Sequence, residues 1–271
     1  MSVHVWSLRW QWAWSFLADQ RFMMMNLKKI TISLALVLGH SAGASDLTVS
    51  AAASLTHAFQ AMGAQFEAQN PGTKVRFNFG ASGALLQQIV NGAPVDVFAS
   101  ADTDTMDKAV AKAVVHAADR KVFTTNRLVL ITPVQSGLGL KQLADLKKPE
   151  VKRFAMGVPA SVPAGHYTQD ALEKAGLWTE LKPKVISTQN VRQALDYVVR
   201  GEVDAGFVYA SDAQLMSDKV KVAFPVATSS PIQYPIAIVA ASANPAQAGK
   251  FMAWVQSPQG QAVLKKHGFG Q

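Results

Sequence analysis

The chain is predicted to be an α/β protein with two lobes, each a mainly parallel sheet flanked by helices. Short apolar runs of strand type alternate with amphipathic stretches along residues 46–271, and this alternation is typical of parallel sheets covered by helices. There is no internal repeat of fixed period and no low-complexity linker. Two stretches, residues 125–127 and the polar residues 228–231, are candidate crossings between the lobes.

The N-terminal 45 residues are expected to lie outside this fold. Residues 23–45 have the parts of a secretory signal peptide: basic NLKK at 26–29, an apolar run too short to span a bilayer, and Ala42 and Ala44 in the A-x-A positions. We expect cleavage after about Ala44 or Ser45 and export to the periplasm. Residues 1–22 hold four of the six Trp and are interpreted as an extension from a start codon assigned too early.

The mature chain is mildly basic and contains no cysteine. Residues 1–45 contain four basic residues and one acidic residue, so their removal lowers the net charge from +8 to +5. No Lys/Arg run of the kind that binds nucleic acid is present. The lack of cysteine excludes disulfides, thiolate metal sites and cysteine nucleophiles, so an exported protein of this size must rely on its core.

The elements of the first half are read in order from periodicity and turn residues. An apolar strand at 47–51 leads to a helix at 54–69, whose apolar residues recur every three or four positions before Asn-Pro-Gly ends it. Alternating residues predict a strand at 74–79, and a Gly-rich break leads to a helix at 84–90. A strand at 96–100, a helix at 106–113 and a β-branched strand at 127–132 follow.

The second half repeats the alternation. Further strands are predicted at 154–158, 185–187, 205–209, 220–224 and 236–241. Further helices are predicted at 141–146, 165–175, 191–199, 246–255 and 259–266. Gly176 and Gly201 lie where two of these helices end.

Four strand-to-helix turns share one chemistry. They contain Ser54, Ser82, the segment VPAG at 162–165 and the segment TQNV at 188–191. All are small or neutral, and each offers backbone N–H groups without an intrahelical partner beside the positive end of a helix dipole. Ligands of such sheets bind where strands enter helices. The turns therefore predict a site for a fully ionised anion.

Two residues of this set have competing interpretations. Ser54 precedes a helical pattern, so it is either an ordinary N-cap or a donor to the anion. Tyr209 ends a buried strand and is either a core aromatic residue or a phenol donor. Several donors are predicted together at the strand ends where helices begin, and this favours the interpretation of both residues as donors to the anion. Each contact to a charged acceptor contributes roughly 1.5–3 kcal/mol, so a few contacts suffice for micromolar binding, about −8 kcal/mol.

Five motifs in order then resemble one family. They are AAASL at 51–55, GAPVDVF at 92–98, VPAG at 162–165, VYASDA at 208–213 and YPIA at 234–237. Together they resemble the periplasmic molybdate-binding proteins of ABC transporters, over about residues 46–269. The resemblance implies the periplasmic solute-binding protein fold, whose lobes close on molybdate or tungstate and deliver it to a membrane permease. It implies no enzymatic activity and no cofactor, with molybdenum present only in the bound oxyanion.

The resemblance also implies which residues bind the anion. The hydroxyl donors correspond to Ser54, Ser82 and Tyr209, and the backbone donors correspond to Ala164 and Val191, with the N–H groups of Ala53 and Ser82 as further candidates. This chain departs from the family beside the second serine, where Gly83 and Ala84 replace hydroxyl residues. We expect that departure to affect affinity or the choice of anion.

The same reasoning gives the domain organisation and the partners. Lobe I is predicted to comprise residues 46–125 and 229–271, and lobe II residues 126–228. We expect a monomer whose partners are the anion and a permease, with no nucleic acid.

Other functions remain open at this stage. Sulfate differs from molybdate mainly in size, and phosphate would need an acceptor; Asp96, Asp102 and Asp212 lie near strand ends, where we interpret them as turn and cap residues. An exported serine hydrolase using Ser54 or Ser82 is the remote alternative, because no G-x-S-x-G elbow is present. No histidine spacing of a zinc site occurs. The export signal and the lack of a helix-turn-helix argue against a regulator's sensor domain.

Overall fold

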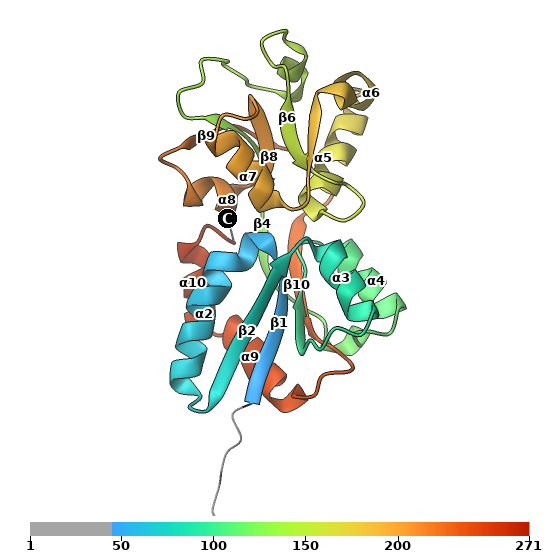
Figure 1. Ribbon diagram of the computed structural model, residues 1–271, viewed down its shortest axis with the longest axis vertical. Coiled ribbons are helices and arrows are strands. Elements are labelled where there is room, and N and C mark those ends of the chain that lie inside the picture. Colours follow the sequence, from blue (N-terminus) through green and yellow to red (C-terminus); the bar gives the residue numbers. More distant parts are fainter. Residues whose placement is uncertain (1–44, 271) are drawn as a thin grey trace, which may run out of the picture. The chain divides into compact units, whose positions relative to one another are not determined.

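The computed structural model describes residues 45–270, and residues 44–271 form one unit. Figure 1 shows two lobes in this unit, each with its own sheet. The predicted extension at 1–22 and almost all of the predicted signal peptide at 23–45 lie outside the described residues.

The first sheet has the order β2-β1-β3-β10-β4. Its strands are β1 (Ser45–Ala52), β2 (Thr73–Gly80), β3 (Val97–Ala99), β4 (Lys121–Asn126) and β10 (Ile232–Ile238). β1 pairs in parallel with β2 and β3, whereas β10 runs antiparallel to β3 and β4. One strand, β10, therefore runs against the other four.

The second sheet has the order β7-β6-β8-β5-β9 and repeats this arrangement. Its strands are β5 (Leu128–Pro133), β6 (Phe154–Gly157), β7 (Val185–Thr188), β8 (Ala205–Tyr209) and β9 (Val220–Val226). β6 pairs in parallel with β7 and β8, and β5 runs antiparallel to β8 and β9. The two mixed sheets, each with one reversed strand, confirm the predicted two-lobed α/β class.

The chain passes between the sheets at two adjacent places. Only Arg127 separates β4 from β5, and residues 227–231 separate β9 from β10. Asn126 pairs with Ile232 on one side of the crossings, and Leu128 pairs with Val226 on the other. The connection is thus a pair of neighbouring strands, and β4 extends through Asn126, one residue beyond the predicted lobe boundary.

Helices cover both faces of the first sheet. The helices of this lobe are α2 (Thr56–Gln69), α3 (Ser82–Val90), α4 (Thr103–Ala111), α9 (Pro245–Gln256) and α10 (Pro258–Lys266). Leu47 and Val49 of β1 pack in one buried cluster with α2 and α9, whereas Phe98 of β3 packs in a second cluster with α3 and α4. Aromatic rings dominate the first cluster, with Phe59, Phe66 and Phe251 in edge-to-face contact.

Three of the four helices described in the second lobe follow strands: α5 (Pro163–Lys174), α7 (Val191–Val199) and α8 (Ala210–Leu215). The fourth, α6 (Trp178–Leu181), follows α5. α5 packs tightly on β6: a Cβ at Gly165 would lie 2.0 Å from the Gly157 carbonyl oxygen, so only glycine fits at this turn. Short 3₁₀ segments, Ala53–Leu55, Ala117–Asp119, Leu143–Lys147 and Lys182–Lys184, complete the fold.

Three differences from the predicted elements concern the connection between the lobes. β4 and α8 were not predicted, because four of the six residues of KVFTTN are polar and ASDAQL is too short to show a helical period. The last strand runs over 232–238 instead of 236–241, since its pairing with β4 begins directly at the crossing. Within the described residues, no helix is long and apolar enough to cross a membrane.

Candidate functional site

The five predicted site residues line one cavity between the two sheets. Ser54 and Ser82 come from the first lobe, and Ala164, Val191 and Tyr209 come from the second. The cavity is small, with a volume of about 10 Å³, roughly the room that one water molecule needs. Among the described residues, no acidic or basic side chain lines it. The small space suits a small ligand held by neutral donors.

Ser54 does not cap a helix, so that interpretation was wrong. It lies inside the 3₁₀ turn Ala53–Leu55, which has Ala52 as N-cap and no side-chain cap. Its buried hydroxyl instead lies 3.0 Å from the Tyr234 hydroxyl. Ser54 lies in the middle of this extra 3₁₀ turn, two residues before α2 begins at Thr56, and Leu55 takes the N-cap position of α2.

Ser82 is the first residue of α3 and is fully buried. Its Oγ accepts a hydrogen bond from the Ala101 N–H at 3.0 Å. A hydroxyl that accepts in this way keeps its own proton available for a ligand. The next residue, Gly83, donates its N–H to the Ser161 carbonyl of the other lobe at 3.0 Å, so the turn also joins the lobes.

Ala164 and Val191 contribute backbone groups at helix starts. Ala164 is the second residue of α5, after Pro163, and Val191 is the first residue of α7, after the N-cap Asn190. The Asn190 side chain accepts from the Gln193 N–H. The N–H groups at these first positions have no intrahelical partner. Both helices therefore point their positive ends at the cavity.

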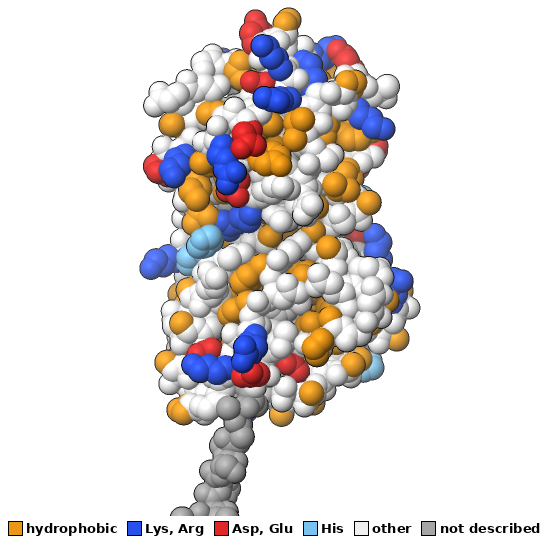
Figure 2. All heavy atoms as spheres, in the orientation of Figure 1, with side chains coloured by type: hydrophobic (Ala, Val, Ile, Leu, Met, Phe, Trp, Pro, Cys, Tyr) orange, Lys and Arg blue, Asp and Glu red, His pale blue; other side chains and the backbone are white. Residues whose placement is uncertain are grey.

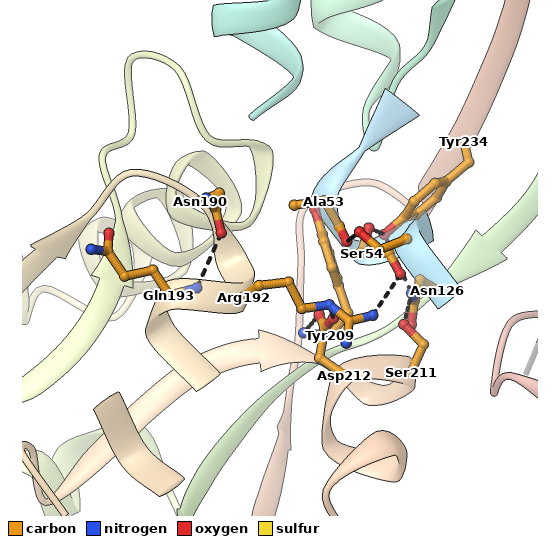
Figure 3. Close-up of polar contacts among 11 residues, drawn as sticks. Ala53, Ser54, Asn126, Asn190, Arg192, Gln193, Tyr209, Ser211, Asp212 and Tyr234 are labelled. Carbon is orange, nitrogen blue, oxygen red and sulfur yellow. Dashed lines mark hydrogen bonds and ion pairs between the residues drawn. The ribbon is translucent and has the colours of Figure 1, made fainter. Parts of the chain in front are cut away.

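Tyr209 supplies a hydroxyl without a partner. Its side chain extends from the end of β8 toward Ala53 (Figure 3), and it is 1% exposed. The Tyr209 hydroxyl is buried and makes no hydrogen bond. Burial is the main cause that raises its pKa well above the ordinary value, so the phenol stays neutral and able to donate. An unmatched buried donor in a cavity wall indicates a missing acceptor.

An ion pair that the sequence did not reveal joins three of these turns. Arg192 Nε lies 2.8 Å from Asp212 Oδ1, and Arg192 Nη2 donates to the Ser54 carbonyl at 2.8 Å (Figure 3). Asp212 also accepts from the Tyr209 N–H. Burial raises the pKa of the Asp212 carboxyl, and the Arg192 charge opposes this shift. The pair thus connects the start of α7, the end of β8 and the Ser54 turn.

A second network lies at the crossings. Asn126 Nδ2 donates to the Ser211 Oγ at 2.8 Å and to the Tyr234 hydroxyl at 3.3 Å. Tyr234 is fully buried, and its hydroxyl also meets Ser54. Asn126, Ser211 and Tyr234 therefore connect the crossing strands with the cavity. Ser211 and Tyr234 belong to the motifs VYASDA and YPIA, but nothing in the sequence indicated that both contact Asn126.

The three aspartates near strand ends have structural partners outside the cavity. Asp102 caps α4 by accepting from the Thr105 N–H, and burial raises its pKa. Asp96 accepts from the Thr48 N–H and the Ser242 hydroxyl. With Asp212 bound to Arg192, none of them lines the cavity. No group of three His, Cys, Asp or Glu that could hold a metal occurs in the part of the chain that is described.

Comparison with known proteins places this site in a family. The family described as bacterial extracellular solute-binding protein matches residues 47–270. The molybdate-binding protein ModA of Haemophilus influenzae is 36% identical over 91% of this chain and 99% of its own length. ModA of Escherichia coli is 38% identical over 82% of this chain and 88% of its own length.

The chain belongs to the ModA family of bacterial extracellular solute-binding proteins. This is a family of binding proteins rather than enzymes, so the hydrolase alternative is set aside. The predicted resemblance to this family and its solute-binding protein fold are therefore confirmed.

Solved structures agree with this assignment. A substrate-binding domain of a putative molybdenum ABC transporter from Clostridium difficile is 36% identical, with a TM-score of 0.64 over 83% of this chain and 98% of that domain. The periplasmic molybdate-binding protein of Azotobacter vinelandii is 27% identical, with a TM-score of 0.74 over 82% of this chain and 98% of its own. The sulfate-binding protein SubI of Mycobacterium tuberculosis, at 18% identity and a TM-score of 0.75, shares the fold.

Proposed function

We propose that this ModA-family protein is an exported receptor that captures molybdate, and also tungstate, between its two lobes and delivers it to the membrane permease of an ABC transporter. Relatives at 36% and 38% identity over most of the chain carry the name molybdate-binding protein. The family description is that of extracellular solute-binding proteins.

The observation that carries the proposal is the chemistry of the cavity. Hydroxyl and N–H donors from five separate strand ends surround a space that no charged side chain lines. The unpartnered Tyr209 hydroxyl adds a neutral donor that needs an acceptor. A fully ionised tetrahedral oxyanion offers acceptors in every direction and needs no acceptor from the protein.

In this proposal the anion is bound by the hydroxyls of Ser54, Ser82 and Tyr209 and by the N–H groups of Ala164 and Val191. The N–H groups of Ala53 and Ser82 are additional donors. Since Ser54 and Ser82 belong to one lobe and the other three to the second, binding favours the arrangement in which the lobes are together.

The proposed lobes are residues 46–125 with 229–271, and residues 126–228. The molecule acts as a monomer in the periplasm after removal of the signal peptide, and it binds the permease but no nucleic acid. Lobe motion occurs about the paired crossing strands, where only Arg127 and residues 227–231 lie outside the sheets.

Sulfate is the alternative ligand within the same function, because it is also a fully ionised tetrahedral dianion. Phosphate fits less well, since its protonated form at neutral pH needs an acceptor and Asp102 and Asp212 are occupied by other partners outside the cavity. The size of the anion is then the property that separates sulfate from molybdate.

A thermal unfolding series tests the proposal. The protein is heated with molybdate, tungstate, sulfate or phosphate, and with sodium chloride at equal ionic strength as the control. A ligand at 100-fold over its Kd stabilises by about 2.7 kcal/mol, which raises Tm by about 5–10 °C for a chain of this size. We expect this shift with molybdate and tungstate alone. No shift with either anion, or a larger shift with sulfate, would contradict the proposal.

A further inference from the structure

Ser54 also lines a second pocket. Residues of both lobes line it: His57, Lys266 and His267 from the first, and Arg192, Ser211 and Gln214 from the second. It has a volume of about 170 Å³, against about 10 Å³ for the cavity. In Figure 2 a histidine lies beside Lys and Arg side chains on the flank where the lobes meet.

The groups in this pocket are donors and cations. Arg192 Nη1 is buried and makes no hydrogen bond. The Ser211 hydroxyl accepts from Asn126, so its proton is free to donate into the pocket. No Asp or Glu lines the pocket. The lining therefore suits a negatively charged ligand that accepts hydrogen bonds.

Four basic side chains line the pocket: His57, Arg192, Lys266 and His267. Burial, then the charge of Arg192 and then that of His267 lower the pKa of His57. Burial, then Lys266 and then Arg192 lower the pKa of His267. Asp212 pairs with Arg192 from outside the lining and offsets one positive charge. His57, Lys266 and His267 have no such acidic partner in the lining.

We propose that this pocket binds a second small dianion, of the dicarboxylate or oxyanion class, between Arg192 of one lobe and His57, Lys266 and His267 of the other. Because the dianion contacts both lobes, it stabilises the arrangement in which they are together. Arg192 also donates to the Ser54 carbonyl at 2.8 Å, so the pocket and the cavity share one connecting side chain.

Two consequences follow. Protonated histidines attract a dianion, so binding strengthens as the pH falls through the histidine range. By linkage, the dianion raises the affinity of the cavity for its own ligand by the same factor by which that ligand raises affinity for the dianion. The second consequence rests on the proposed function, whereas binding in the pocket does not.

Oxalate and sulfate are suitable probes because both remain dianions from about pH 6 to about pH 8, so a change in their binding reports the histidines. Each probe is titrated by calorimetry into protein without molybdate and into molybdate-saturated protein. We expect the molybdate-saturated protein to bind the probe at one site. The affinity of this site should be at least fivefold higher at about pH 6 than at about pH 8. Saturation with molybdate excludes competition for the cavity. Binding of sulfate alone would assign the oxyanion class, and binding of both would assign small dianions generally.

The double variant His57→Gln with His267→Gln tests the location, and His116→Gln, a substitution outside the pocket, is the matched control. We expect the double variant to lose the pH dependence and at least tenfold in probe affinity, and the control to keep both. In histidine NMR spectra of the unmodified protein, oxalate should raise the pKa of His57 and His267.

Three outcomes would overturn the proposal: no saturable binding of either probe, equal binding by the double variant, or an equal effect of sodium chloride at the same ionic strength. If molybdate itself fails to bind, the proposed function fails, but the oxalate titration of molybdate-free protein still decides on the pocket.

Discussion

Two buried tyrosines lie at the centre of the molecule with their ring centroids 5.8 Å apart, yet their hydroxyls differ. The Tyr234 hydroxyl meets Ser54 and Asn126. The Tyr209 hydroxyl is buried without a partner. A buried hydroxyl without a partner costs about 1–3 kcal/mol, so its retention at Tyr209 is understandable where a ligand supplies the missing acceptor.

Replacement of Tyr209 by Phe therefore separates binding from stability. We expect Tyr209→Phe to weaken molybdate binding by about 1.5–3 kcal/mol, the value of a hydrogen bond to a charged acceptor, or about 10- to 150-fold in Kd. The ligand-free protein should be equally or more stable, because no hydrogen bond of the protein is lost. Calorimetric titration and urea unfolding measure the two quantities.

Tyr234→Phe is the matched control for this substitution. It removes a hydroxyl with protein partners, so it should lower the free energy of unfolding by about 0.5–1.5 kcal/mol. An unchanged molybdate affinity in Tyr209→Phe would remove that hydroxyl from the site.

The individual residues differ in how far the sequence predicts them. Free N–H groups in the turns VPAG and TQNV follow from the position of each turn at a helix start, which is a local property, whereas the choice of Ala164 and Val191 as donors is implied by the family resemblance and stays a prediction. The ion pair of Arg192 with Asp212 and the contact of Ser54 with Tyr234 join residues far apart in the chain. Such pairs depend on how the lobes come together, and no periodicity encodes that.

At the scale of elements, the reversed strands explain both the success and the failures of the prediction. Parallel strands with their helices produce strong local patterns, and they were found in order. β4 is an edge strand with the mainly polar sequence KVFTTN, and its partner β10 has an irregular register at Tyr234 and Pro235. Strands that connect two lobes contain residues that contact neighbours of the cavity as well as residues that pack in the sheet. Apolar and polar residues therefore alternate only weakly there.

The start of α3 gives a prediction about lobe closure. A Cβ at Gly83 would lie 2.9 Å from the Cα and the carbonyl oxygen of Ser161 in the other lobe, and backbone atoms cannot yield as a flexible side chain can. Gly83→Ala should therefore hold the lobes apart and weaken molybdate binding. Overpacking of this kind costs about 1–3 kcal/mol, so we expect a loss of about 5- to 150-fold in a calorimetric titration.

Gly249→Ala in α9 is the control for the change in helix propensity, because the nearest atom to its Cβ would be Ile238 Cδ1 at 3.9 Å. It should leave the affinity unchanged. Equal affinities for both variants would mean that the approach of Gly83 to Ser161 is not needed for binding. In that case, the presence of Gly83 where the family has a hydroxyl residue would affect only the choice of anion.

For the whole molecule, the class of fold was predictable because two similar lobes repeat one alternation of strands and helices. The sequence of motifs fixed the family, and the comparisons agree. The relation between the lobes was not predictable, since it rests on contacts such as Gly83 with Ser161 and Arg192 with Ser54. The basic residues of the pocket come from both lobes, so they lie together only when the lobes are in this arrangement.

This charge predicts how stability depends on pH. The pKa values of His57 and His267 are lower in the folded protein than the ordinary value of 6.5, through burial first and then through neighbouring positive charge. In the unfolded chain both histidines take up protons near pH 6.5, whereas the folded protein takes them up only at lower pH. Below that value the unfolded chain binds more protons at these two histidines, so their contribution to the free energy of unfolding falls as the pH falls from about 7 to about 5.5.

Urea unfolding of the ligand-free protein at several pH values between about 7.5 and about 5.5 measures this effect. The carboxylates with lowered pKa, Glu67 and Asp145, act at lower pH, whereas Asp102 and Asp212, whose pKa values burial raises, oppose the histidines as the pH falls. The histidine contribution is therefore the difference between variants: the double variant His57→Gln with His267→Gln should lose less stability than the unmodified protein over this interval, because neither glutamine titrates, and His116→Gln should behave as the unmodified protein. An equal pH dependence in the double variant and the unmodified protein would contradict the prediction. Addition of oxalate should reduce the loss in the unmodified protein, since a bound dianion favours the protonated histidines in the folded state.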